Sequence, residues 1–304
     1  MPTLRDIRRR IASVRNTQQI TRAMKMVAGA KLRRAQQLLA AVRPYAHDIT
    51  ALVRCLLAEL DYRDLPLIQP PDPAAPQALI LFTADRGLCG SFNTNLLRAA
   101  RSRLAELKAQ GRRVFLVTVG RKGARFFQRL YRRRREEAVE HEDWPGLYET
   151  ACMSGFLRLA GRLEKDVAEG RLSSVRVLFS LFHSVVKQEP TERVLVPIGE
   201  EELTAAGTAE EHGEETPQPL LEPDAATVAR EVFRRYLAVG LYRALVENWA
   251  SEMGARMTAM DAATNNAEEL IETLTLDYNK ARQAAITREI VDITGGAEAL
   301  KEAM

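Results

Sequence analysis

"MGARMTAMDAATNNAEELIETLTLDYNKARQ", residues 253–283, places apolar or small side chains at steps of three and four. This spacing is typical of a helix whose one face packs against a second helix in a coiled coil. No proline follows Pro223, so the pattern predicts a helix of about 70 residues and roughly 105 Å. A single compact domain has no core of that length. The expected seam consists of Met253, Met257, Met260, Thr264, Ala267, Ile271, Leu274, Tyr278 and Ala281.

The partner helix is expected at the other end of the chain, where proline is absent from Thr3 to Arg43 and Gly29 is the single glycine. Pro44 should kink or interrupt it, because proline lacks an amide donor and clashes with the preceding turn. We predict that helices at roughly 3–60 and 224–295 pack antiparallel, the second ending near "TGG" at 294–296. Apolar residues of the first helix recur at Leu4, Ile7, Ile11, Val14, Ile20, Met24 and Val27.

The middle of the chain has a different pattern. "LPLIQPPDPAAP", residues 65–76, holds five prolines and predicts a linker. Short apolar runs then alternate with helical stretches, which is typical of a mostly parallel sheet covered on both faces. The expected strands are 77–84, 112–120, 174–184 and, as an edge candidate, 192–198; the expected helices lie near 93–110, 121–131 and 147–169.

The predicted fold is therefore an antiparallel coiled coil of long N- and C-terminal helices with an inserted Rossmann-like α/β domain. Residues 199–223 are acidic and nearly free of large apolar side chains, so we expect a mobile loop there. The expected parts are an N-terminal helix at 1–64, the linker at 65–76, the α/β domain at 77–198, the loop at 199–223 and a C-terminal helix at 224–304.

Charge is distributed unevenly. Residues 1–45 hold eleven Lys or Arg against one acid, Asp6, while no Lys or Arg lies between Arg193 and Arg230. Such asymmetry indicates a basic surface for an acidic partner. The apolar runs are too short to span a bilayer, which takes about 20 residues. The three scattered cysteines favour a reducing compartment, and with four dispersed histidines they give no metal-ligand spacing: Cys55, Cys89 and Cys152; His47, His141, His183 and His212.

"TADRGLCGSFN", residues 83–93, lies between a strand and a helix, where a glycine-rich loop could hold phosphate. Its spacing is neither the dinucleotide fingerprint nor a P-loop. Cys89 lacks a neighbouring base that would make it a nucleophile. We instead expect Gly87 and Gly90 to shape a tight turn between the strand and the helix. Asp85 or Arg86 is expected either to fix this turn or to contact a neighbouring subunit.

Three segments in this order resemble one family. "RRRIASVRNTQQITRAMKMVAGAKLRRAQ" (8–36), "TADRGLCGSFN" (83–93) and residues 250–300 are similar to the N-terminal, central and C-terminal signatures of the γ subunit of F-type ATP synthases. The resemblance implies a non-catalytic central rotor shaft without cofactor or metal. Its implied partners are the α and β subunits of the α3β3 ring, the ε subunit and the c-ring. It implies a peripheral protein on the cytoplasmic face of a bacterial inner membrane.

The resemblance also implies residues that meet the partners. Met24 and Lys25 match positions beside an acidic loop of β, although Met24 could instead fill the helix seam. Arg282, Gln283 and Thr287 match polar contacts to β. Arg256 matches a family arginine, for which a structural ion pair is the alternative. The implied contact set is completed by Arg8, Arg9 and Arg15.

One different class of function fits the same charges. A nucleic-acid-binding protein could use the basic first helix as an arm, through Arg5, Arg8, Arg9, Arg10 and Arg15. Against it, the basic stretch lacks aromatic side chains that stack on bases. The run "RRRR" at 132–135 is expected to be a solvated face, with contact to the c-ring or ε as its alternative.

Overall fold

A computed structural model describes residues 3–59, 67–68, 72, 74–134, 139–144, 146–150, 153–198, 221–222 and 224–302. Most of the acidic loop at 199–223, most of the linker and the side chains of the Arg132–Arg135 run lie outside this description. The chain forms two units. The helix-pair unit comprises Met1–Val27 and Met257–Met304, and the sheet unit comprises Ala28–Arg256. Two helices, α1 (Leu4–Glu59) and α7 (Ala225–Glu302), each contribute residues to both units.

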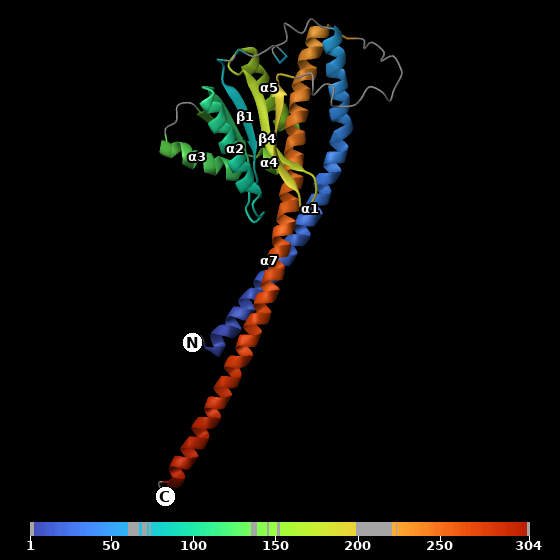
Figure 1. The fold of residues 1–304 in the computed structure, drawn as a ribbon. Helices are drawn as coiled ribbons and strands as arrows, with labels where there is room; N and C mark the ends of the chain where they lie inside the picture. The colour runs from blue at the N-terminus through green and yellow to red at the C-terminus, as the bar shows by residue number, and fades with distance from the viewer. Residues whose placement is uncertain are drawn as a thin grey trace. The chain divides into compact units, whose positions relative to one another are not determined.

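The helix-pair unit is an antiparallel pair, as the sequence predicts (Figure 1). Three contacts show that the two helices run in opposite directions. As the residue numbers on α1 increase, the residue numbers of their partners on α7 decrease. Arg8 donates to the Tyr278 hydroxyl at 2.6 Å, and the hydroxyls of Thr21 and Thr264 lie 2.8 Å apart. Lys25 forms an ion pair with Asp261.

The seam of this pair confirms the α7 pattern and corrects that of α1. Every α7 residue of the expected seam is buried or half-buried. On α1, however, Ile20 is 60% and Val27 55% exposed. Gln18 and Thr21 occupy the seam after Val14 instead, because this path keeps the repeat of about 3.5 residues that a supercoiled pair requires. Polar Gln18 and Thr21 therefore lie in the seam, while apolar Ile20 and Val27 lie on the exposed face of α1.

The described residues of the sheet unit form a five-stranded sheet in the order β3-β2-β1-β4-β5. β1 to β4 are parallel, and β5 is an antiparallel edge strand paired with β4. The strands are β1 Gln77–Phe82, β2 Val114–Val119, β3 Val139–Asp143, β4 Ser174–Phe182 and β5 Gln188–Val196. The remaining helices among the described residues are α2 Phe92–Ala109, α3 Arg121–Arg134, α4 Leu147–Thr150 and α5 Met153–Ala168.

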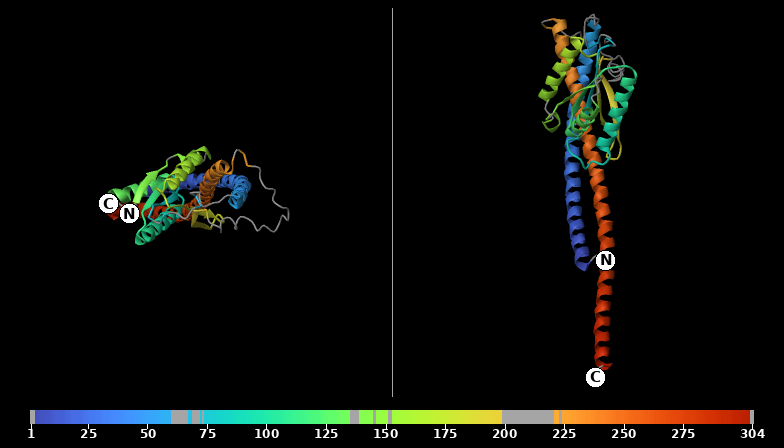
Figure 2. Two further views of the ribbon diagram at one scale, coloured as in Figure 1. Left: turned by 90° about the horizontal axis from the view of Figure 1, so that it is seen from above. Right: turned by 90° about the vertical axis from the view of Figure 1, so that its left-hand side faces the viewer.

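Alternation along β1 divides the interior into two cores, since neighbouring side chains of a strand point to opposite faces. Leu79 and Leu81 join α2 and α3 residues such as Leu96 and Phe127. Ile80 and its neighbours on the other face pack against α5, α1 and α7. Figure 2 shows α2 and α5 on opposite sides of the strands. This arrangement confirms the mostly parallel sheet with both faces covered.

Three local expectations differ from the structure. α1 continues through Pro44, so the interruption, one of the two expected effects, is wrong; Ile49 and Val53, in the turns that follow, are buried. α7 continues through Gly295 to Glu302, so the stop at 294–296 is wrong; glycine costs a helix only about 1 kcal/mol per residue. β3 was not expected, because "VEHED" is too polar to indicate a buried strand, and it lies at the sheet edge beside β2.

A disulfide tests the pairing in the helix-pair unit. Thr21→Cys combined with Thr264→Cys should cross-link on mild oxidation, because the two hydroxyls are 2.8 Å apart. The cross-link is measured as a mobility change on non-reducing electrophoresis, with the natural cysteines replaced by serine. Thr21→Cys with Glu268→Cys is the control, since Glu268 is exposed. Equal cross-linking of both pairs would contradict the register.

Candidate functional site

The sheet has the crevice at which open α/β proteins bind ligands. From β1 the chain moves through α2, β2, α3 and β3 to one side, and β4 then pairs on the other side of β1. Ligands of such sheets bind beyond the carboxyl ends of the strands at this switch point. Residues 83–91, which follow β1, lie at this position.

The protein's own helix α7 covers the carboxyl end of β4 there. The Asn248 side-chain oxygen accepts a hydrogen bond from the Ser180 amide at 3.0 Å. The Ser251 hydroxyl donates to the Ser180 carbonyl at 2.8 Å. Asn248 and Ser251 are fully buried. The backbone groups that could bind a ligand at this end of β4 are therefore bonded to α7.

One turn further along α7, a buried polar cluster joins α7 to the loop after β1. Glu252 and Arg256 form an ion pair at 2.5 Å, with only 4% and 11% of their side chains exposed. Arg256 also donates to the Gly87 carbonyl at 3.1 Å, and the Tyr148 hydroxyl donates to Glu252. Burial raises the pKa of Glu252, while the charge of Arg256 opposes this change.

The loop fixed by this cluster presents one apolar side chain to solvent. Leu88 has φ 64° and is 64% exposed, a left-handed conformation that is uncommon for a residue with a side chain. The Asp85 carboxylate accepts from the Arg121 amide at 2.9 Å and so ties the loop to the start of α3. Gly90 has φ 56°, as a tight turn requires. Gly87 does not have a positive φ. It contributes to the loop through its backbone carbonyl, which accepts from Arg256, and not through the absence of a side chain.

Cys89 is a core residue of this loop. It is 1% exposed, and burial raises the pKa of its thiol, with Glu252 adding to the rise. A raised pKa leaves little thiolate at neutral pH, whereas a nucleophilic cysteine needs a lowered one. The loop thus positions Leu88 and supplies no reactive group.

Apart from Arg256, the expected partner-contact residues fall into three sets. Arg8 and Lys25 are bonded within the chain, to Tyr278 and to Asp261. Met24 is half-buried at the seam, and Arg9 and Arg15 are exposed. Arg256 fits the structural alternative, because it is buried in the cluster described above. The third set, Arg282, Gln283 and Thr287, is exposed on α7.

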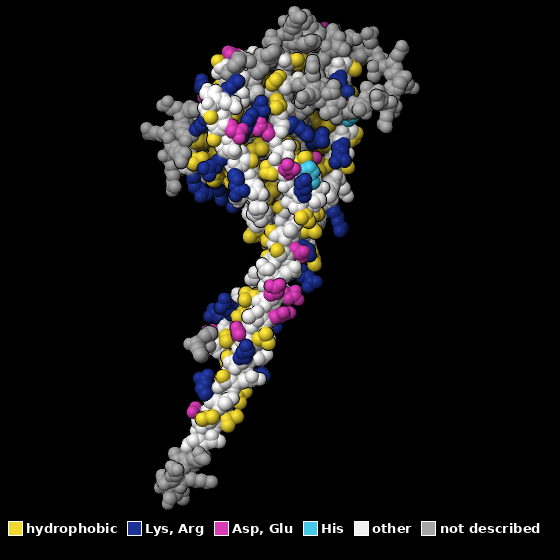
Figure 3. Space-filling view, viewed as in Figure 1, with side chains coloured by type: hydrophobic (Ala, Val, Ile, Leu, Met, Phe, Trp, Pro, Cys, Tyr) yellow, Lys and Arg dark blue, Asp and Glu magenta, His cyan; other side chains and the backbone are white. Residues whose placement is uncertain are grey.

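Beyond Ala281, α7 has no α1 residue opposite it, because the pairing that joins Arg8 to Tyr278 reaches the start of α1 there. Residues 282–295 are exposed except for half-buried Ala285. Several are large and apolar, and Figure 3 shows apolar side chains along this end of α7. The exposed apolar residues of this end are Ile286, Ile290, Val291 and Ile293. An apolar row of this kind indicates a surface that a partner covers.

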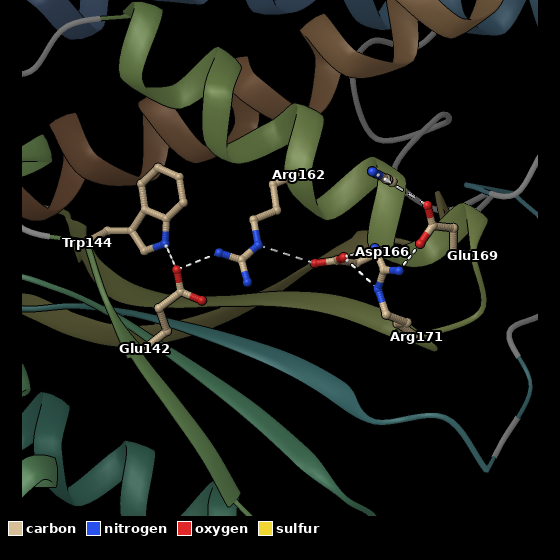
Figure 4. Close-up of polar contacts among 7 residues, drawn as sticks. Glu142, Trp144, Arg162, Asp166, Glu169 and Arg171 are labelled. Carbon is tan, nitrogen blue, oxygen red and sulfur yellow. Dashed lines mark hydrogen bonds and ion pairs between the residues drawn. The ribbon is translucent and has the colours of Figure 1, made fainter.

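A second polar cluster, drawn in Figure 4, joins β3 to α5 and to the turn after it. Glu142 accepts from Trp144 at 2.9 Å and pairs with Arg162 at 2.7 Å. Arg162 continues to Asp166, which pairs with Arg171 at 2.6 Å. Its arginines are about half exposed, so each ion pair contributes about 1 kcal/mol or less to the free energy of unfolding. The cluster therefore links β3 and α5 at the surface and stabilises the fold only weakly.

Sequence reasoning missed Glu252, Tyr148 and Leu88. The sequence signal for Glu252 was weak, because a glutamate four residues before an arginine is common on exposed helices. Within the described part of the chain, no group of His, Cys, Asp and Glu side chains has the arrangement of a metal site. Among the same residues, no helix is long and apolar enough to cross a bilayer.

The fold and the covered crevice define a protein built on two long antiparallel helices with an α/β domain inserted between them. The ATP synthase family model matches residues 3–300. The ATP synthase gamma chain of Salinibacter ruber is 42% identical over 312 residues, covering 99% of both chains. That of Moorella thermoacetica is 44% identical over 301 residues, covering 99% of this chain and all of the other. The chain belongs to the family of ATP synthase gamma chains, which are non-catalytic subunits.

Solved structures agree on the fold. A chain of the Euglena gracilis mitochondrial ATP synthase, in the OSCP/F1/c-ring structure, has a TM-score of 0.64 at 19% identity, with coverage of 98% of this chain and 94% of that one. A chain of the Tetrahymena thermophila central stalk and c-ring structure has a TM-score of 0.54 at 25% identity, with coverage of 80% and 99%. Because the chain belongs to this family, the alternative prediction of a nucleic-acid-binding protein is rejected.

Proposed function

We propose that this chain is the central rotor shaft of an F-type ATP synthase. It couples ion flow through the c-ring to sequential conformational changes of the catalytic β subunits, in synthesis or in reverse hydrolysis of ATP. The observation that carries the proposal is the end of α7, where residues 282–295 expose apolar and polar side chains and no described residue of α1 lies opposite.

Such an end suits a shaft that turns inside a ring of subunits. A row of exposed apolar side chains on one helix gives contact area without a deep pocket that would fix a single orientation. Polar contacts at an exposed interface are worth about 1 kcal/mol or less each, so they can break at every step. Arg282, Gln283 and Thr287 are the polar residues that we assign to contacts with β.

The outward face of α1 supports the same function. Arg9 and Arg15 are exposed, and Met26 and Val27 are 65% and 55% exposed. A surface of cations and thin apolar side chains fits an acidic, apolar partner that slides past it. We assign Arg9, Arg15 and half-buried Met24 to the α3β3 ring, and Lys25 to a pair that can exchange Asp261 for an acid of β.

The α/β domain is assigned to the side of the complex that meets the ε subunit and the c-ring. Relatives in the Euglena and Tetrahymena structures come from assemblies that include the c-ring. With no spanning helix among the described residues, we propose a peripheral location on the cytoplasmic face of a bacterial inner membrane, reached through these partners.

A triple variant tests the proposed contacts: Arg282→Ala, Gln283→Ala and Thr287→Ala. The side chains are exposed, and alanine favours helix, so the unfolding midpoint should stay within error. If the three contacts together change the barrier between steps by about 1.4–3 kcal/mol, turnover should fall about tenfold to a hundredfold. ATP hydrolysis and ATP-driven ion pumping are measured in the reconstituted complex.

The matched control is Arg158→Ala, an exposed arginine on α5, which should leave both rates unchanged. Unchanged rates for the triple variant as well would remove these residues from the mechanism. Failure of the wild-type chain to assemble with α and β would instead contradict the proposed function itself.

A further inference from the structure

Two neighbouring hollows lie on the surface of the sheet unit where α2 and α3 meet. Their volumes are about 750 and 210 Å³, and Arg101 borders both. Together they form the α2–α3 groove. From Thr94 to Lys108, its lining residues on α2 span about 21 Å, at about 1.5 Å per residue. The groove is therefore long enough for about four turns of a partner helix.

The floor of the groove is apolar. Leu97 of α2 and Phe126 and Leu130 of α3 line it, and all three are only half-buried. They pack against the core between these helices and the sheet. The Phe126 ring also meets the buried Phe127 ring edge-on, with 5.1 Å between the ring centres. The core therefore holds the floor in place, and a partner with apolar side chains can cover its exposed part.

Exposed arginines flank this floor. They are Arg98 and Arg101 on α2, and Arg125 and Arg129 on α3. Among the described residues, no acid forms an ion pair with any of these four arginines. The sequence of α3 contains no acid, and the single acid of α2, Glu106, pairs with Arg103 at 3.0 Å. Figure 3 shows Lys and Arg side chains, with hydrophobic ones between them, over this part of the sheet unit.

We propose that the α2–α3 groove binds an acidic amphipathic helix of a protein partner. The apolar face of such a helix would cover Leu97, Phe126 and Leu130, as helices do that bind in hydrophobic grooves. Its carboxylates would meet the flanking arginines, which gives charge complementarity. A nucleic acid or a membrane surface would meet the same arginines through phosphates, but neither needs an elongated apolar floor. The inference does not rest on the rotor function, which assigns no contact to these residues.

The test is fluorescence anisotropy of the full-length chain with a labelled helical peptide of about 18 residues, long enough to fill the groove. The peptide has leucine at steps of three and four and glutamate on its other face. We expect saturable binding of one peptide per chain. Arg98→Ala combined with Arg101→Ala should lower the affinity about tenfold, because two ion pairs are lost. Leu97→Ala should lower it about tenfold as well, and this loss should persist at high salt, because an apolar contact is not screened.

Two matched controls remove the same chemistry elsewhere. Arg33→Ala combined with Arg158→Ala takes two charges from exposed positions of α1 and α5. Val186→Ala shortens an apolar side chain that is 84% exposed in the turn after β4. Both controls should bind the peptide as the wild type does. Unfolding midpoints of all variants are measured, so that a folding defect in Leu97→Ala leaves the exposed arginines as the deciding variant.

A charge exchange tests the complementarity directly. Arg98→Glu combined with Arg101→Glu should lose the glutamate peptide and bind the same peptide with lysine in place of glutamate. Absence of peptide binding, or an equal loss with Arg33→Ala and Arg158→Ala, would overturn the proposal. An unchanged affinity in folded Leu97→Ala would also overturn it, because the floor would then not be covered. Polyuridylate or phosphatidylglycerol vesicles that bind through Arg98 and Arg101 while the peptide does not would assign the groove to phosphates instead.

Discussion

Glu252→Ala lowers the free energy of unfolding by about 3–5 kcal/mol, because it leaves the buried Arg256 guanidinium without its counter-charge. The pair is 2.5 Å long, and the two side chains are 4% and 11% exposed. The same change removes the acceptor of the Tyr148 hydroxyl. Urea unfolding followed by circular dichroism measures the loss.

Two variants separate the buried charge from other effects. Glu252→Leu combined with Arg256→Met should lose less than the single change, because removing both charges of a buried pair leaves none uncompensated. Glu231→Ala breaks ion pairs on the same helix whose side chains are about half exposed, and should cost about 1 kcal/mol or less. A loss for Glu252→Ala no larger than that for Glu231→Ala would show that the cluster is solvated.

Gly120→Ala should be at least as damaging, with a loss of more than about 4 kcal/mol or failure to fold. Gly120 follows β2 with φ 110°, and a Cβ there would lie 2.1 Å from the Thr83 carbonyl oxygen. The obstacle is the backbone after β1, which cannot move without shifting the loop that carries Leu88. Soluble yield and the unfolding midpoint measure the effect.

Gly111→Ala is the matched control, because it has φ 70° and no atom within 4 Å of the added Cβ. It introduces left-handed strain alone, at a cost of roughly 1–2 kcal/mol. Gly87→Ala should be near neutral, since its nearest neighbour is the flexible end of Lys122 at 3.6 Å. Similar losses at Gly120 and Gly111 would contradict a steric role for Gly120.

The α7 seam could be predicted because a helix seam is a local property of spacing. Met260, Ala267 and Leu274 are buried as their period requires. The α1 seam was harder, because its central positions are Gln18 and Thr21 and apolar Ile20 lies outside. A polar residue in a seam depends on its partner, here the Thr264 hydroxyl, and one helix does not specify that partner.

The residues near the switch point likewise include some features that the sequence predicts and others that depend on tertiary contacts. The turn after β1 was expected from its glycines, and Gly90 has the positive φ of a turn. The left-handed conformation at Leu88 was not expected, because residue type disfavours it and only surrounding contacts can hold it. One contact that fixes this loop comes from Arg256, which donates to the carbonyl of Gly87, 169 positions away in sequence.

The sequence by itself therefore determined the two long helices, the mostly parallel sheet between them and the family, because helical period, strand alternation and signature motifs are all local patterns. The tertiary structure alone decided that α7 covers the crevice at β4 and that Glu252 and Arg256 are buried together. These features join segments distant in sequence. Whether a polar side chain is solvated or buried with a partner depends on those segments, and no local pattern records it.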